Sequence, residues 1–144
     1  MTRLPTQTAP TTEAFLARTG PELADLCTAC GACFRACPIA DHLGLAGVDA
    51  GAVTADLRRL AKGEPATLPE TLQWVGACAK SGLCIPACPE HANGLDARLL
   101  VRVARQSALN HTRQITSKHD AAAFPRVKVF ARLQLTDEEQ DRWL

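Results

Sequence analysis

The chain has 144 residues, a formal net charge of +1 and 4% aromatic residues, and its length allows one small domain with tails. The near-neutral charge argues against the overall basicity that most nucleic-acid-binding domains show. The N-terminus lacks the apolar run of a signal peptide, and no stretch approaches the ~18 apolar residues of a membrane span. We therefore expect a cytoplasmic protein with no transmembrane segment and no nucleic acid partner.

The N-terminal segment is rich in Thr and Pro, which predicts an arm with little regular structure over residues 1–19. Thr19 and Glu22 form a capping-box pattern around Pro21, and this pattern predicts a helix start. The predicted helix is short, because the first cysteine of the chain follows directly after Leu26.

Two further helices are predicted in the middle of the chain. Asp49 is a candidate N-cap and Gly63 a candidate stop for a helix over roughly 50–62, which has apolar residues along one side. Thr67 and Glu70 form a second capping-box pattern, which predicts a short helix that leads toward a second group of cysteines.

The C-terminal part combines one long helix with a different kind of segment. The spacing of Leu and Val predicts the longest helix over 94–109. The alternating run RVKVF, residues 126–130, predicts a strand or an extended docking segment, and Thr136 with Glu139 predicts one more helix start. No strand-rich region is present, so the sequence predicts an all-α fold with extended N- and C-terminal arms.

The segment CTACGACFRACP carries a C-x2-C-x2-C-x3-C-P run, whose cysteines are Cys27, Cys30, Cys33 and Cys37. This run is typical of bacterial-type ferredoxins, in which three of the cysteines bind one iron–sulfur cluster and the fourth binds the neighbouring cluster. A zinc site needs only four ligands, usually from two CxxC pairs, and an odd total of seven cysteines fits full disulfide pairing badly. The pattern therefore favours iron–sulfur clusters over zinc or disulfides.

A second segment, CAKSGLCIPACP, nearly repeats the first but has serine, Ser81, where its second cysteine would stand. Two such segments predict two clusters with crossed ligation. We expect cluster one to be a 4Fe–4S cluster held by Cys27, Cys30, Cys33 and Cys88. Cluster two is then held by Cys37, Cys78 and Cys84.

Ser81 leaves two alternatives open for cluster two. Serine is a poor iron ligand while its hydroxyl is neutral, because oxygen is a harder donor than sulfur. One alternative is a 3Fe–4S cluster, with Ser81 filling the space beside the missing corner. The other is a second 4Fe–4S cluster, with Ser81 or water as the ligand of the fourth iron.

The two motifs, separated by 40 residues between Cys37 and Cys78, resemble those of the α-helical ferredoxin family. They are similar to the dicluster iron–sulfur subunit of heterodisulfide reductases and to the iron–sulfur subunits of anaerobic glycerol-3-phosphate dehydrogenases. They also resemble the C-terminal domain of succinate dehydrogenase and fumarate reductase iron–sulfur subunits, whose C-x5-C-x3-C-P motif holds a 3Fe–4S cluster. Cys78, Cys84, Cys88 and Pro89 have this spacing.

The resemblance covers residues 20–110 and implies an α-helical ferredoxin dicluster domain there. The arm at 1–19 precedes this domain, and residues 111–144 follow it as a partner-docking tail. Two features depart from the family. The 26 residues before Cys27 contain no cysteine, so the 2Fe–2S domain of succinate dehydrogenase has no counterpart in them. Ser81 also breaks the full second set of four cysteines found in the heterodisulfide reductase protein.

Two groups of side chains outside the cysteines are candidates for docking or shielding. Arg98, Arg102 and Arg105 share one face of the longest predicted helix and could bind an acidic partner, although an ordinary solvated face explains them equally well. Trp74, four residues before Cys78, could shield cluster two from water, with core packing as the alternative.

The resemblance implies an electron-transfer subunit that relays single electrons through its two clusters within a larger oxidoreductase complex. Its partners would be a flavoprotein or a heterodisulfide-reductase-like subunit, in solution or at the periphery of a membrane complex. The chain has no nucleophile–base pattern, so we do not expect it to be catalytic alone. The alternative is a structural or oxygen-sensing iron–sulfur module that assembles with a partner without carrying catalytic current.

Overall fold

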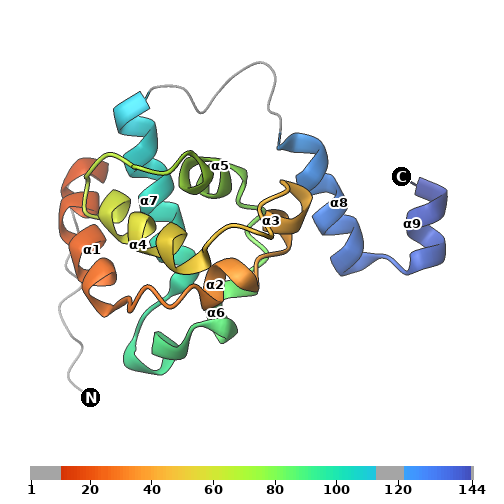
Figure 1. Ribbon diagram of the computed structural model, residues 1–144, viewed down its shortest axis with the longest axis horizontal. Coiled ribbons are helices and arrows are strands. Elements are labelled where there is room, and N and C mark those ends of the chain that lie inside the picture. Colours follow the sequence, from red (N-terminus) through yellow and green to blue (C-terminus); the bar gives the residue numbers. More distant parts are fainter. Residues whose placement is uncertain (1–10, 113–121, 144) are drawn as a thin grey trace.

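The computed structural model describes residues 11–112 and 122–143, and over these ranges every regular element is a helix (Figure 1). This result confirms the predicted all-α fold. The longer helices are α1 (Thr12–Leu26), α4 (Ala50–Ala61), α5 (Pro69–Ala77), α7 (Ala97–Thr112), α8 (Ala123–Gln134) and α9 (Asp137–Trp143). The shorter ones are α2 (Ala32–Arg35), α3 (Pro38–His42), α6 (Cys84–Ala87) and a 3-10 helix, η1 (Pro89–Asn93).

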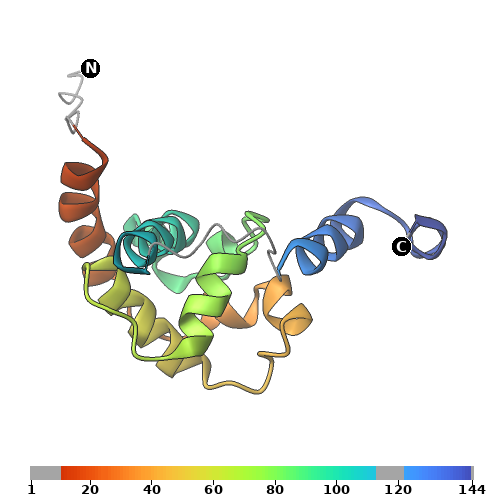
Figure 2. The same ribbon diagram turned by 90° about the horizontal axis from the view of Figure 1, so that it is seen from above.

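Helices α1, α4, α5 and α7 pack together around the hydrophobic core (Figures 1 and 2). Helix α4 begins where the sequence predicts, because the Asp49 carboxylate accepts hydrogen bonds from Gly51 N and Ala52 N at 2.9 and 3.2 Å. It ends just before Gly63, whose backbone is left-handed. Aliphatic side chains of α4 and α7 form the centre of the core, namely Val53, Leu57, Leu60, Leu100 and Val103.

Helix α1 begins earlier than the sequence predicts. Thr11, rather than Thr19, is its N-cap, and Thr11 Oγ1 accepts a hydrogen bond from Ala14 N at 3.1 Å. Residues 12–19 are therefore helical and are not part of an arm without regular structure. Thr19 is buried within the helix, and Pro21 lies in its interior instead of at its first turn. Packing of α1 against α4 and α7 outweighs the local start signal.

Gly20 determines how closely α1 approaches α4. A Cβ atom at this position would overlap the backbone carbonyl oxygen of Ala61, the last residue of α4. Because this neighbour is backbone, it cannot move aside as the end of a flexible side chain could. The glycine thus permits a close helix crossing shortly before the cysteine loop that begins at Cys27.

A buried carboxylate positions the start of α5. Asp56 of α4 accepts hydrogen bonds from Thr67 N, Thr67 Oγ1 and Leu68 N at 2.9, 2.8 and 3.0 Å. Burial on its own would raise the pKa of Asp56, but these hydrogen bonds outweigh burial and the pKa is lowered. The predicted capping box at Thr67 is therefore wrong. Leu68 is the N-cap, and Pro69 is the first residue of α5.

Helix α7 is the longest helix of the described residues, and it begins slightly later than predicted. Asp96 precedes it, and the Asp96 carboxylate accepts a hydrogen bond from Leu99 N at 2.9 Å, as an N-cap does. Helix α7 packs against α1, α4, α5 and α6, so it borders both the core and the cysteine-rich segments. Over the described ranges, no helix combines the length and the apolar character that crossing a bilayer requires.

The C-terminal helices α8 and α9 extend away from the helical body (Figures 1 and 2). The strand or extended segment predicted for RVKVF is wrong, because residues 126–130 lie within α8. Val129 is fully buried where α8 packs on α3, whereas Phe124, Val127 and Phe130 are exposed. An alternation of polar and apolar residues over only five positions does not distinguish a strand from a helix that carries apolar side chains on two sides.

The capping box predicted at Thr136 is confirmed. Thr136 N donates a hydrogen bond to Glu139 Oε2 at 2.9 Å, and Glu139 N donates one to Thr136 Oγ1 at 3.3 Å. Helix α9 follows directly, so the C-terminal part of the tail is helical. The section of the predicted tail over residues 113–121 lies outside the described residues.

Candidate metal centre

The two cysteine-rich segments follow the same backbone path, so the sequence repeat is also a structural repeat. Ala29 and Gly31 have left-handed backbones, with φ of 56° and 79°. Lys80 and Gly82 stand at the same distances from the first cysteine of their segment, and their φ values are 61° and 78°. Each loop continues into a four-residue helix, α2 or α6, and then into a second short helix that begins with proline, α3 or η1.

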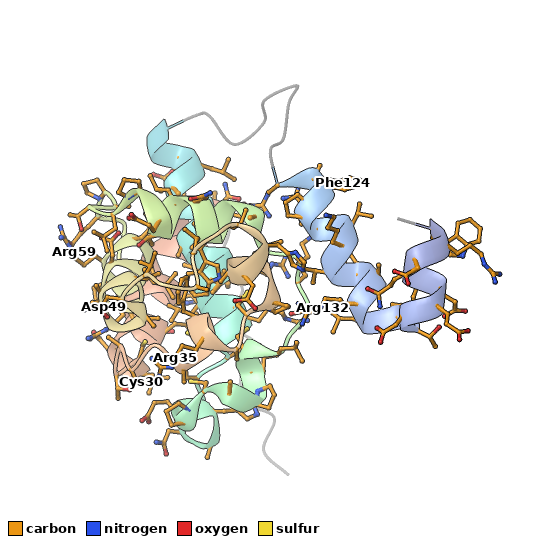
Figure 3. All side chains as sticks on the ribbon, turned by 45° about the vertical axis from the view of Figure 1, so that its right-hand side comes forward. Cys30, Arg35, Asp49, Arg59, Phe124 and Arg132 are labelled. Carbon is orange, nitrogen blue, oxygen red and sulfur yellow. The ribbon has the colours of Figure 1, made fainter. Side chains whose placement is uncertain are left out.

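The first cysteine pocket is lined by Cys27, Cys30, Cys33 and Cys88, the four residues predicted to hold cluster one. Cys27 and Cys33 are buried, whereas Cys30 is exposed (Figure 3). The Arg35 guanidinium donates a hydrogen bond to the Cys30 carbonyl oxygen at 2.9 Å. The pocket is therefore closed toward the core and reaches the surface beside Arg35.

The second cysteine pocket is lined by Cys37, Cys78 and Cys84, the three residues predicted to hold cluster two. All three are half-buried. Ser81 and the ring of Trp74 line the same pocket. The fourth side of this pocket thus presents a hydroxyl group where the first pocket presents a thiol.

Each pocket takes one cysteine from the other loop. Cys88 follows the second loop but lines the first pocket, and Cys37 follows the first loop but lines the second pocket. The structure thus brings each predicted ligand set together. The pockets are also neighbours, because Cys33 and Cys84 lie close enough for negative charge on Cys84 to raise the pKa of Cys33.

Burial makes these cysteines poor thiolates in the absence of a positive charge. Burial, and to a lesser extent the charge of neighbouring cysteines, raises the pKa of Cys33 to about 12 and that of Cys84 to about 11. Burial also raises the pKa values of Cys27 and Cys37. Thiolates in these pockets therefore need cations beside them, and iron ions would meet that need.

N–H groups lie near the sulfur ligands of both pockets. In the first, Ala29 N donates to Cys27 Sγ at 3.4 Å. In the second, burial raises the pKa of Cys37, and the nearby Trp74 side chain and the backbone N–H groups of Ile39 and Ala40 oppose that rise. Such bonds orient sulfur ligands and adjust the reduction potential of the cluster that they hold.

Trp74 is both a core residue and a wall of the second pocket. Its side chain is only 1% exposed, and its ring meets that of Phe34 edge to face, with the centroids 5.0 Å apart. Phe34 lies in α2, next to Cys33. The aromatic pair therefore connects the two cysteine segments. Sequence reasoning missed the closeness of Trp74 to Cys37, because these residues are far apart in the chain.

The three arginines predicted for partner binding lie at two different places. Arg98 lines the second cysteine pocket, whereas Arg102 and Arg105 line a groove between α1 and α7 with a cavity volume of about 500 Å³. This α1–α7 groove adjoins the second pocket, since Cys78 lines both. The sequence did not reveal the groove, because one wall is Phe15 of α1, where no helix was predicted.

The donor sets of the two pockets fit iron–sulfur clusters. No group of three or more His, Cys, Asp or Glu side chains in the described part of the chain is spaced to hold a single metal ion. Cluster ligands have a different requirement, because they bind separate irons and need not converge on one point. A bound cluster supplies one-electron redox chemistry, while the residues of the chain bind it, orient it and exclude water.

Residues 23–40, which contain the whole first cysteine run, match a family model described as a 4Fe-4S binding domain. This segment is thus of the iron–sulfur ferredoxin type, and the match supports a 4Fe–4S cluster and an electron-transfer role for the chain. The match does not extend to the second cysteine segment. No curated protein and no solved structure matches the chain.

Proposed function

We propose that the chain is an electron-transfer protein that holds two neighbouring iron–sulfur clusters and relays single electrons through them. The observation that carries this proposal is the crossed arrangement of seven free cysteines around two adjoining pockets, which a zinc site or a disulfide would not require. Cluster one is a 4Fe–4S cluster held by Cys27, Cys30, Cys33 and Cys88. Cluster two is held by Cys37, Cys78 and Cys84.

The closeness of the two pockets supports a relay, because electron transfer between cofactors slows steeply as their separation grows. Cys33 of the first pocket lies in α2 and Cys84 of the second lies in α6, and these two helices pack on each other. Trp74 lines the second pocket, and its buried partner Phe34 follows Cys33 of the first pocket in α2, so this part of the protein is closed to water. A dry connection between the two clusters is what an internal electron path needs.

Electrons would enter and leave at two different surfaces. Of the seven cysteines, Cys30 is the exposed one, so cluster one would exchange electrons there (Figure 3). Cluster two would exchange electrons through the α1–α7 groove, where Lys80, Arg102 and Arg105 supply positive charge. We therefore propose that an acidic surface of a partner protein occupies this groove.

The proposed setting is a larger cytoplasmic oxidoreductase complex, whose partner subunit is a flavoprotein or a heterodisulfide-reductase-like protein. The dicluster domain would span residues 20–110 together with the earlier turns of α1, and residues 111–144 would dock the partner. Exposed apolar side chains on α8 support docking, because four large apolar groups lie uncovered on this helix: Phe124, Val127, Phe130 and Leu133. Figure 3 shows Phe124 at the start of this helix.

A structural or sensing module is the second candidate, and the observation that favours it is the shortness of two helices beside the cysteines. Helices α2 and α6 have four residues each, and helices of that length are not stable by themselves in water. The clusters would therefore also hold this part of the fold in place. Loss of structure after cluster removal fits both candidates, so only redox behaviour separates them.

An EPR-monitored potentiometric titration of the anaerobically purified protein, with iron counted on the same sample, tests the proposal. We expect about seven or eight irons per chain and two reversible one-electron transitions within the range of about −700 to +450 mV known for such clusters. About four irons per chain would contradict a second cluster. Two clusters without reversible transitions in that range would favour the structural module.

A further inference from the structure

The second loop keeps the backbone of a four-ligand loop although it carries one cysteine fewer. Ser81 follows Cys78 by three residues, as Cys30 follows Cys27. In both loops the residue at this position stands between two residues with left-handed backbones. Cys30 lines the first pocket, and Ser81 lines the second. The Ser81 side chain is thus held at the corner where the first loop presents a cysteine.

The backbone of Lys80 indicates that the second loop keeps this shape against the conformational preference of its own residues. Residues other than glycine rarely adopt the left-handed region, because their Cβ atom crowds the following carbonyl group. Among the described residues, Ala29 and Lys80 are the non-glycine residues with positive φ, and they are equivalent positions of the two loops. A loop that only had to carry Cys78 and Cys84 would not need this strained turn directly before Ser81.

The charges around the two pockets differ near this corner. Glu90 lines the first pocket, whereas Lys80 and Arg98 line the second. Two nearby cations favour a negatively charged ligand, so they favour the alkoxide form of the Ser81 side chain when metal is present. Ser81 Oγ accepts a long hydrogen bond from Leu83 N, at 3.5 Å, which leaves a lone pair free to bind iron.

We propose that Ser81 Oγ is the fourth protein ligand of cluster two, and that it holds a fourth iron that leaves more readily than the other three. The inference rests on the proposed function, because it takes Cys37, Cys78 and Cys84 as the other ligands. When Ser81 binds, the O–H bond breaks, its proton passes to water and the oxygen bonds to iron. Oxygen is the harder donor, so this corner is the weakest bond between chain and cluster.

To complete its fourth corner, cluster two takes up one ferrous ion and one electron. A three-iron core with three ferric ions then becomes a four-iron core with two ferric and two ferrous ions, and a one-electron reductant supplies the electron. Oxidation reverses the change and releases ferrous ion. Ser81 thereby makes cluster two convertible between two forms, which a fourth cysteine would prevent.

The test compares wild type, Ser81→Ala and Ser81→Cys, with Thr28→Ala as the control because Thr28 lines the first pocket without being a proposed ligand. Each anaerobic protein is oxidised mildly and examined by low-temperature EPR for the signal of an oxidised three-iron cluster. It is then incubated with ⁵⁷Fe²⁺ and dithionite and desalted. The retained ⁵⁷Fe is counted by mass spectrometry and assigned by Mössbauer spectroscopy.

We expect wild type and Thr28→Ala to give the three-iron signal and then to retain about one ⁵⁷Fe per chain, the single iron that completes a four-iron cluster. Ser81→Ala should give the signal but retain at least about tenfold less ⁵⁷Fe, because no side chain of the protein then holds the fourth iron. Ser81→Cys should give no three-iron signal, because a thiolate keeps the fourth iron during oxidation.

Two outcomes would overturn the inference while leaving the second cluster in place. Equal ⁵⁷Fe uptake by Ser81→Ala and wild type would show that Ser81 is not the ligand, and no uptake by wild type would show that the corner is closed. If the Ser81→Ala protein does not assemble its clusters, the Ser81→Cys protein still tests the proposal. A three-iron signal from Ser81→Cys would show that residue 81 does not reach the fourth corner of cluster two. Absence of the three-iron signal in wild type with about eight irons per chain would show that the fourth iron does not leave readily, whereas about four irons per chain would contradict the proposed function instead.

Discussion

At the scale of single residues, Trp74 connects the helical core with the chemistry of the second pocket. Its side chain lies close enough to Cys37 to oppose the rise that burial causes in the pKa of that thiol, and its ring packs edge to face on Phe34. A hydrogen bond to a sulfur ligand stabilises the extra negative charge of a reduced cluster more than the charge of the oxidised one. Trp74 should therefore raise the reduction potential of cluster two.

Replacing Trp74 by phenylalanine removes the N–H group and keeps most of the buried ring. We expect Trp74→Phe to lower the potential of cluster two by on the order of 40 mV, because a hydrogen bond contributes about 1 kcal/mol and a one-electron potential changes by about 59 mV for each tenfold change in equilibrium constant. An EPR-monitored potentiometric titration measures this, with cluster one as the internal control. An unchanged potential for cluster two, or an equal fall for both clusters, would contradict this role.

The cysteines show which parts of the candidate site the sequence could reveal. Their division into two sets follows from the spacing and the repeat, and the structure groups the same residues around the two pockets. The closeness of Trp74 to Cys37 could not be predicted, because it depends on how α5 packs against α3. The left-handed backbone of Lys80 was also hidden, because lysine carries no sequence signal for that conformation.

At the scale of helices, the crossing of α1 and α4 depends on the absence of a side chain at Gly20. We expect Gly20→Ala to destabilise the protein by about 1–3 kcal/mol, because the new Cβ would push the backbone of α1 away from Ala61. The thermal unfolding midpoint of the anaerobic, cluster-loaded protein, followed by circular dichroism, measures this effect.

Gly76 in α5 is a matched control for Gly20, since a Cβ atom there meets no neighbouring atom. Alanine has the higher helix propensity, so Gly76→Ala should leave the midpoint unchanged or raise it, by up to about 1 kcal/mol of stability. If Gly20→Ala behaved like Gly76→Ala, the close crossing of α1 and α4 would be disproved.

Helix boundaries were predictable where local capping decides them and not where packing does. Asp49 and Thr136 both form the capping bonds that the sequence predicts. Pro21, by contrast, resembles a helix start but lies inside α1, because the contacts of α1 with α4 and α7 hold the helix together on both sides of it. In α8, the buried Val129 and its exposed apolar neighbours imitate the alternation of a strand.

At the scale of the whole molecule, the cysteine segments add a second connection between two halves of the chain, which the core already joins through the packing of α4 on α7. The first loop lies between α1 and α4, the second between α5 and α7, and their short helices α2 and α6 pack on each other (Figure 1). Crossed ligation would make each cluster a link between the two segments. Folding of this region and assembly of the clusters should therefore be coupled.

The most direct test of this account compares Cys84→Ala with Cys88→Ala by EPR in the oxidised and the reduced state. The two cysteines stand four residues apart in one segment, yet Cys84 lines the second pocket and Cys88 the first. We predict that Cys88→Ala loses or alters the signal of cluster one alone, and that Cys84→Ala does so for cluster two alone. If both substitutions affected the same cluster, each segment would hold its own cluster, and crossed ligation would be contradicted.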